Sequence, residues 1–238
     1  MARADAGKPR LSQRDLDALE WLEEMRAVYE SDLAILLGNL DGRGPVSPTA
    51  VRKTIRRWSS LGVAKAEKVL ARVPRFVWPT NEGARLVGAQ HWTEPGWAIL
   101  RHTALVSRVR LWLERRGIAG QTVDEWISER RWRQRHQEAV RAGKHVPDAI
   151  AMAGGEEHAI EVELSDKGPS KTLSTAVQLT RGHQHVIYII PAHSQTARTV
   201  QGALDQVLRD KWRKGDGNIG VLELPGDITG GSETDVRE

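Results

Sequence analysis

The sequence predicts an α/β protein in two domains, a helical domain that ends in a β-hairpin and a larger domain in which helices and strands alternate. Three helical segments followed by two strand-like runs occupy residues 11–80, and segments of helical and strand periodicity then succeed one another over residues 98–224. A length of 238 residues is sufficient for one large or two small domains with hydrophobic cores.

The positive charge of the chain is concentrated in its first part. Residues 1–145 contain 26 Lys and Arg against 17 Asp and Glu, whereas residues 146–238 contain 9 against 14. This asymmetry indicates a part that binds a polyanion, joined to a part with another role. The chain has no cysteine, which excludes disulfides and thiolate metal sites. We find neither a signal peptide nor a long apolar run, so we expect a cytoplasmic protein that does not associate with membranes.

The segments 11–26, 29–38 and 47–62 are predicted as helices because their apolar residues recur at helical spacing. Residues that start or stop helices lie at their ends: Ser12 with Asp15, Ser47 with Pro48, Gly38 and Gly62.

The third predicted helix has a basic face. Its inward stripe consists of Val51, Ile55, Trp58 and Leu61, and its Arg and Lys residues lie outside that stripe. A hairpin is predicted over 63–80 around a basic turn. Three helices and a basic hairpin resemble a winged helix-turn-helix, in which the third helix enters the major groove and the hairpin contacts the backbone. The DNA-binding residues that follow are Arg52, Lys53, Arg56, Arg57, Lys65, Lys68, Arg72 and Arg75. A basic helix face that is merely solvated is the alternative interpretation.

The second domain is predicted to begin near Pro95, after a short helix and a connecting loop over 79–95. We expect a helix over 98–117, strands over 123–134, 145–152 and 158–165, a helix over 170–183, a strand over 185–191, a helix over 195–214 and a strand over 218–224. The strand over 123–134 is expected at an exposed sheet edge. The polar residues 226–238 are predicted to be a disordered tail.

The order α-β-β-β-α-β-α-β, with Pro147-Asp148 opening one strand and acids along the next, resembles the PD-(D/E)xK restriction-endonuclease-like fold. The resemblance covers residues 98–224, within a domain expected over 96–225. With the winged helix over 1–95 in front, the whole chain resembles the replication-relaxation family of mobile-element DNA-binding proteins.

The acidic residues of the strand over 158–165 are predicted to cluster. Side chains alternate along a strand, so Glu161 and Glu163 share one face, while the apolar residues between them share the other face and pack inward. Asp148 on the neighbouring strand brings a third carboxylate. Oxygen ligands suit Mg²⁺ or Mn²⁺, and such a metal polarises a phosphate and activates a water. The resemblance implies Asp148 and Glu161 as metal ligands, and Glu163 is a further candidate.

Glu163 stands where the nuclease pattern has a lysine. Lys167 and Lys171 are the candidates for the missing catalytic lysine. Lys167 would have to be folded back by a turn, because about 13 Å of extended strand separates it from Glu163. Lys171 opens the next helix, where some members of this fold carry their lysine. A lapsed site, with solvated acids on an edge strand, is the alternative interpretation.

The sequence favours a DNA-binding accessory protein of a plasmid or integrative element, acting in replication, conjugative transfer or its regulation. The alternatives are an active Mg²⁺-dependent DNA nuclease or nickase, which the missing lysine weakens, and a winged-helix transcriptional regulator. The expected partners are double-stranded DNA and a second copy of the chain, with contacts through residues 98–117 and the strand edge near 125–133. A relaxase or other transfer or replication proteins of a relaxosome are further candidate partners.

Overall fold

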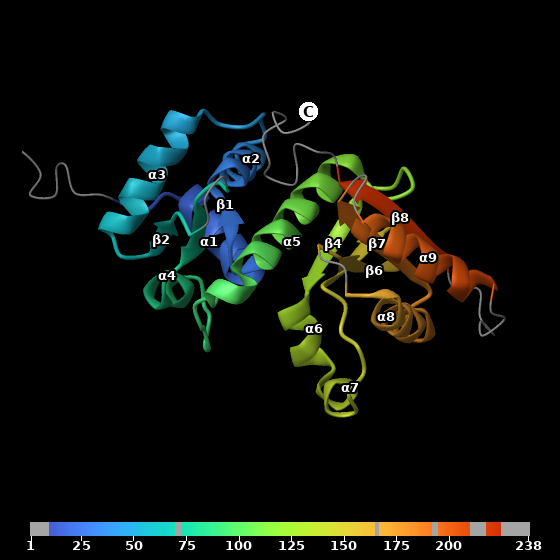
Figure 1. Ribbon diagram of the computed structural model, residues 1–238. Coiled ribbons are helices and arrows are strands. Elements are labelled where there is room, and N and C mark those ends of the chain that lie inside the picture. Colours follow the sequence, from blue (N-terminus) through green and yellow to red (C-terminus); the bar gives the residue numbers. More distant parts are fainter. Residues whose placement is uncertain (1–9, 70–72, 165–166, 192–194, 210–217, 225–238) are drawn as a thin grey trace, which may run out of the picture. The chain divides into compact units, whose positions relative to one another are not determined.

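A computed structural model describes residues 10–69, 73–164, 167–191, 195–209 and 218–224 (Figure 1). These residues form a mixed α/β structure with helices and two sheets, which confirms the predicted fold class at this level. The chain divides into two compact units, Met1–Leu111 and Trp112–Glu238, and the division falls inside helix α5 (Trp97–Arg116) rather than near Pro95. The tail predicted over 226–238 lies outside the described residues.

The first helix, α1 (Gln13–Met25), begins with the predicted capping box. The Ser12 hydroxyl accepts a hydrogen bond from the Asp15 N–H at 3.3 Å, and the Asp15 carboxylate accepts one from the Ser12 N–H at 2.7 Å. These bonds satisfy donors that a helix start otherwise leaves unpaired. Ala18, Leu19 and Leu22 lie fully buried on the inner face of the helix.

The second helix, α2 (Glu30–Leu40), continues past Gly38, so the prediction that Gly38 ends it was wrong. A Cβ atom at Gly38 would lie 2.3 Å from the carbonyl oxygen of Gly44. The glycine is therefore needed for the close approach of the following loop to the helix, and it is not a helix stop.

The third helix, α3 (Pro48–Ser60), begins as predicted. The Ser47 hydroxyl accepts the Ala50 N–H at 3.3 Å, and Pro48 occupies the first turn. Val51, Ile55 and Trp58 are buried in the core of the first unit, together with leucines of α1 and α2. Leu61 follows the helix as its C-cap, is partly buried and packs against the same core, so the predicted inward stripe is confirmed and continues into the cap.

The predicted hairpin consists of β2 (Ala64–Glu67) and β3 (Phe76–Pro79), which pair antiparallel. A two-residue strand between the first two helices, β1 (Val28–Tyr29), pairs with the other side of β3 and was not predicted. The expected short helix follows as α4 (Asn81–Leu86), capped by Thr80. The first unit therefore has the element order α1-β1-α2-α3-β2-β3-α4, followed by the beginning of α5.

Polar contacts from the middle of α5 hold this helix to the rest of the first unit. The Ser107 hydroxyl donates to the Ala27 carbonyl at 2.6 Å, and the Arg108 guanidinium donates to the Asp32 carboxylate at 2.7 Å. Arg108 also lies over the Tyr29 ring, 4.6 Å from its centroid. Because Ser107, Arg108 and Asp32 are buried, this part of α5 completes the core of the first unit.

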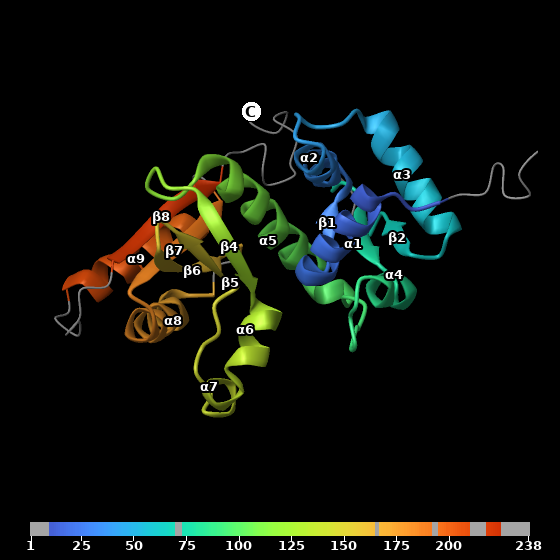
Figure 2. The ribbon, with the colours of Figure 1, turned by 180° about the vertical axis from the view of Figure 1, so that it is seen from behind.

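The second unit is built on a mixed sheet, whose strands within the described residues have the order β4-β5-β6-β7-β8 (Figure 2). They are β4 (Val123–Ser128), β5 (Ala149–Ala153), β6 (Glu156–Val162), β7 (His185–Pro191) and β8 (Asn218–Leu224). The first three strands pair antiparallel and the last three pair parallel. β4 is at an edge of the described sheet, as predicted, whereas the acidic strand β6 is in its middle.

The segment between β4 and β5 differs from the prediction of one long strand over 123–134. The strand ends at Ser128, whose hydroxyl accepts the Arg131 N–H at 3.4 Å and so caps α6 (Glu129–Arg135). A second short helix, α7 (Gln137–Arg141), follows. After it, the strands expected over 145–152 and 158–165 are β5 and β6, which form a hairpin around Gly154 and Gly155. Both glycines have positive φ, as a two-residue turn of this kind requires.

Helices α8 (Pro169–Gly182) and α9 (Gln195–Arg209) lie side by side on one face of the sheet (Figures 1 and 2). The core on this face contains Val186, Tyr188 and Ile190 of β7, with Ala176 and Leu204 from the two helices. Side chains of β6 that neighbour Tyr188 therefore point into a covered interior.

Candidate nucleic-acid interface and acidic cluster

The outer face of α3 exposes Arg52, Lys53 and Arg56. Arg52 makes a weak ion pair with Glu30, because its Nε lies 3.8 Å from Glu30 Oε1 and its side chain is 59% exposed. No acidic residue occurs within the helix. These three cations form a positive surface, which we call the α3 basic face.

The structure does not leave all predicted DNA-binding residues available. Arg57 donates to Asp15 Oδ1 at 2.5 Å, and Asp15 is fully buried. Asp15 Oδ1 also accepts the Trp58 indole N–H at 3.0 Å. Arg57 therefore serves as the counterion of a buried carboxylate, which neither the helix period nor the charge pattern indicated.

The hairpin cations are likewise partly engaged. Lys65 contacts Glu94 at 2.9 Å, and Arg75 makes a bidentate ion pair with Glu30 at 2.7 and 3.0 Å. Lys68 is exposed, and Arg72 lies outside the described residues. Among the hairpin candidates that the structure describes, Lys68 is thus the one that is exposed and has no acidic partner.

The three predicted carboxylates come together at the end of β6. Ala149 is paired with Ile160, which places Asp148 opposite Glu161, and Glu161 is paired with Tyr188 on β7. Glu163 follows two residues beyond Glu161 and projects to the same face by strand alternation. We call Asp148, Glu161 and Glu163 the acidic cluster.

The two glutamates of the acidic cluster are buried and Asp148 is half-buried, which contradicts the interpretation of solvated acids on an edge strand. Glu161 and Glu163 are each 3% exposed. Their face is the one that α8 and α9 cover, and the apolar residues Ile160 and Val162 on the other face are buried as well. The prediction that only the apolar face packs inward was wrong because β6 is a central strand with two covered faces.

His145 is an immediate partner of the cluster that the sequence analysis missed. Its Nε2 lies 3.2 Å from each carboxylate oxygen of Glu161, and its backbone N–H donates to Gln178 at 3.2 Å. The hydrogen bond with Glu161 raises the pKa of the His145 imidazole. Burial raises the pKa of the Glu161 carboxyl, Asp148 adds to the effect, and His145 opposes it. Because His145 precedes Asp148 by three residues, its place in the sequence could have indicated that it lies near the acidic cluster.

Of the two lysines that the sequence offers in place of the missing motif lysine, Lys167 contacts the acidic cluster. Its Nζ lies 2.7 Å from Glu163 Oε2, so the ammonium group is brought back to the carboxylates. Partial burial lowers the pKa of Lys167, but the bond to Glu163 and the charges of Glu161 and Asp148 outweigh burial, and the pKa is raised. Lys171 is exposed in the first turn of α8, and no contact with the carboxylates is found for it among the described residues.

The carboxylates, as they are placed, do not fit a divalent cation. Asp148 accepts the Val162 N–H at 2.7 Å, Glu161 contacts His145, and Glu163 is paired with Lys167. Within the described part of the chain, no group of three or more His, Asp or Glu side chains is arranged to hold a metal ion. The negative charge of the cluster is therefore partly offset by an imidazole and an ammonium group of the protein itself.

Tyr188 completes the surroundings of the cluster. Its hydroxyl is buried and has no hydrogen-bond partner among the described residues. Burial and the charges of Glu161, Glu163 and Asp148 together raise its pKa. No sequence pattern indicated that Tyr188 neighbours the acidic cluster, because this placement depends on the parallel pairing of β6 with β7.

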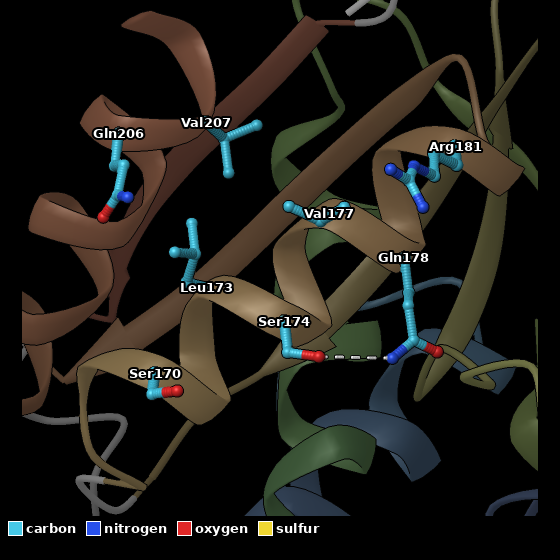
Figure 3. Close-up of a pocket in the computed structure, with 8 residues that line it drawn as sticks. All are labelled: Ser170, Leu173, Ser174, Val177, Gln178, Arg181, Gln206 and Val207. Atoms are coloured by element: carbon cyan, nitrogen blue, oxygen red, sulfur yellow. Dashed lines mark hydrogen bonds between the residues drawn. The ribbon is translucent and has the colours of Figure 1, made fainter. Parts of the chain in front are cut away.

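A separate groove of about 460 Å³ lies along α8 and α9 (Figure 3). Leu173, Val177 and Val207 supply its apolar surface, and the Gln178 side chain donates to the Ser174 hydroxyl at 3.5 Å. The lining contains no carboxylate, and no ligand chemistry follows from it.

No protein-family model matches the chain, and no curated protein matches it. None of the described helices combines the length and the apolar composition needed to cross a bilayer.

Proposed function

We propose that this protein binds duplex DNA through its first unit, with α3 as the helix that enters the major groove. The observation that carries the proposal is the α3 basic face: Arg52, Lys53 and Arg56 point to solvent while Val51, Ile55 and Trp58 fix the opposite side of the helix in the core. A rigid helix with a row of cations suits both phosphate contacts and readout of base edges.

The order of elements supports this proposal. A winged helix-turn-helix has three helices, a short strand after the first helix and a hairpin after the third, and α1-β1-α2-α3-β2-β3 has the same order. In such a domain the hairpin lies beside the recognition helix, so Lys68 is the residue of β2 and its turn that we assign to the DNA backbone.

For the cellular role, we propose a DNA-binding accessory protein of a plasmid or integrative element, acting in replication, conjugative transfer or its regulation. This part of the proposal is supported by the sequence resemblance to replication-relaxation proteins alone. A homodimer on paired half-sites, with a relaxase or other transfer proteins as partners, belongs to the same proposal.

The test is DNA binding by the full chain as a function of salt. The variant R52A/K53A/R56A is expected to bind a 30-bp duplex more weakly than the wild type and to lower the log–log salt slope by about 2.7, since each lost phosphate contact contributes about 0.9. The control R10A/R85A/R101A removes three exposed arginines of the same unit and should leave the slope nearly unchanged. Equal slopes for both variants would exclude the α3 basic face as the contact.

Metal-dependent DNA cleavage by the second unit is the second candidate function. The position of Lys167 within reach of Glu163 favours it. The internal pairing of all three carboxylates opposes it, and we derive no catalytic step from this arrangement. Incubation with supercoiled plasmid, with and without Mg²⁺ or Mn²⁺, separates the alternatives: nicking that D148A and E161A abolish would establish a nuclease, and binding without nicking leaves an accessory or regulatory role.

A further inference from the structure

The second unit carries a basic segment that the proposed function does not use. Residues 130–144, which we call the basic arm, comprise nearly all of α6, all of α7 and the turn that follows. The arm contains six Lys and Arg and one acidic residue, Glu138, whereas the remaining residues of 112–238 contain 11 Lys and Arg against 18 Asp and Glu. A local concentration of cations in an otherwise acidic unit requires an explanation.

The backbone of the arm is firmly attached to the sheet. Trp132 is buried in the core beneath α8 and α9, and His136 stacks on it with ring centroids 4.3 Å apart. The Glu129 N–H, at the start of α6, donates to the Asp148 carbonyl at 3.1 Å, and Ala139 and Val140 of α7 are partly buried and pack against the same core. The two helices are therefore a fixed scaffold for the side chains on their outer surface.

Four cations of this scaffold point to solvent: Arg133, Arg135, Arg141 and Lys144. The ion pairs that two of them make are weak, because Arg133 with Glu129 at 2.8 Å is about half exposed on both sides and Arg135 lies 3.7 Å from Glu125. Contacts of this kind exchange readily for a phosphate, which carries a full negative charge and several acceptor oxygens.

The chemistry of the arm fits a nucleic-acid backbone better than a protein partner. A protein interface has an apolar centre with a polar rim. The exposed large apolar residues of the described chain are Leu40, Leu86, Trp97 and Ile99, and none of them is on the arm. Cations without an apolar centre are the composition that sequence-independent phosphate contacts require.

We infer that the basic arm is a second DNA-binding surface, which contacts the phosphate backbone of duplex DNA through Arg133, Arg135, Arg141 and Lys144. The choice of DNA as the polyanion rests on the function proposed for the first unit, but the surface belongs to the second unit and makes its own contacts. Its contribution is to affinity and to salt dependence, and it carries no base readout.

The experiment compares two full-length variants that each lose four exposed cations from the second unit. R133A/R135A/R141A/K144A removes the four cations of the arm, and R115A/R116A/R181A/R198A is the matched control. Binding to a 30-bp duplex is measured by fluorescence anisotropy between 50 and 200 mM salt. The arm variant is expected to lower the log–log slope by about 3.6 and to weaken binding at least about tenfold, while the control stays near the wild type. An arm variant that behaves like the control would overturn the inference.

Two further measurements keep the result interpretable. R133K/R135K/R141K retains the charge and should retain most of the binding, because phosphates accept Lys as a point charge. If it binds as weakly as the alanine variant, loss of charge is not the cause and the inference fails. Tighter binding of duplex RNA than of duplex DNA by the wild type, lost in the arm variant, would assign the arm to another polyanion and would also overturn it.

The R52A/K53A/R56A variant separates this inference from the proposed function. A normal salt slope in that variant with a reduced slope in the arm variant would reject α3 and leave the arm as the DNA contact. The reverse result would reject the arm and leave α3.

Discussion

At the scale of single residues, the first unit depends on one buried carboxylate. Asp15 closes the capping box of α1 with Ser12, accepts the indole N–H of Trp58 and pairs with Arg57 of α3. Burial alone would raise the pKa of Asp15, but the hydrogen bonds from Ser12, Trp58 and Arg57 outweigh burial, so the pKa is lowered. The same side chain thus starts one helix and attaches another.

We expect Asp15→Asn to lower the free energy of unfolding by about 2 kcal/mol, because it weakens several bonds to a buried group. A carboxyl whose pKa is lowered on folding contributes stability above its unfolded pKa of about 4, and this contribution is lost as pH falls further. Urea denaturation at pH 7 and at pH 3 should show a smaller difference between variant and wild type at the lower pH. The control is Asp17→Asn, two residues further along α1, because Asp17 accepts a hydrogen bond from Gln13 and not from the partners of Asp15. An equal loss of stability in both variants would contradict the role of Asp15.

Lys167 has an analogous role in the second unit, as the counterion of buried Glu163. Lys167→Met should destabilise the protein by about 2 kcal/mol, less than the 3–5 typical of fully buried pairs because a third of the lysine side chain is exposed. The double variant E163Q/K167M should recover much of this loss, since no unpaired charge remains. Thermal melting measures both, with Lys171→Met as the control. If Mg²⁺ raises the wild-type Tm and D148A removes that rise, the cluster holds a metal and the internal pairing is not its resting state.

At the scale of elements, local sequence signals predicted where helices begin. They failed where contacts between distant segments determine the secondary structure or the burial of a residue. Ser12 and Ser47 cap helices as expected because a cap is a contact within one turn. The segment after Ser128 was predicted to continue the strand because its apolar and polar residues alternate in part. Ser128 is also a residue that can cap a helix, and in the structure it caps α6. Strand parity placed Glu161 and Glu163 on one face, but their burial follows from the pairing of β6 with β5 and β7, which no local pattern encodes.

Gly38 offers a direct test of one such distant contact. Gly38→Ala should destabilise the protein by about 1–3 kcal/mol, because the new Cβ would meet the Gly44 carbonyl oxygen at 2.3 Å. Gly202→Ala in α9 is the matched substitution, since nothing lies within 4 Å of its added Cβ, and it should stabilise the helix by up to about 1 kcal/mol. Chemical denaturation should give shifts of opposite sign, and a stabilising Gly38→Ala would show that the loop does not approach the helix.

At the scale of the whole molecule, the division inside α5 predicts which fragment folds. A fragment of residues 1–116 retains Ser107 and Arg108 and should unfold cooperatively, whereas a fragment of residues 1–95 leaves Asp32 buried without its counterion. Burial raises the pKa of Asp32 despite Arg108, which indicates the cost of an unpaired carboxylate at this position. Circular dichroism melting distinguishes the fragments, and equal cooperativity would place the functional boundary near Pro95 after all.

The chain contains two tyrosines, and each compact unit holds one of them, Tyr29 in the first and Tyr188 in the second. Burial raises the pKa of both phenols, so near pH 10 each should be less ionised in the native protein than in the unfolded chain, where a tyrosine has a pKa of about 10. Tyrosinate absorbs near 295 nm, so unfolding at that pH raises the ultraviolet absorbance. Each unit contributes one tyrosine to this rise. Replacing Tyr29 or Tyr188 by Phe would then assign each step of the rise, and the protein would report the order in which its two units open without any attached label.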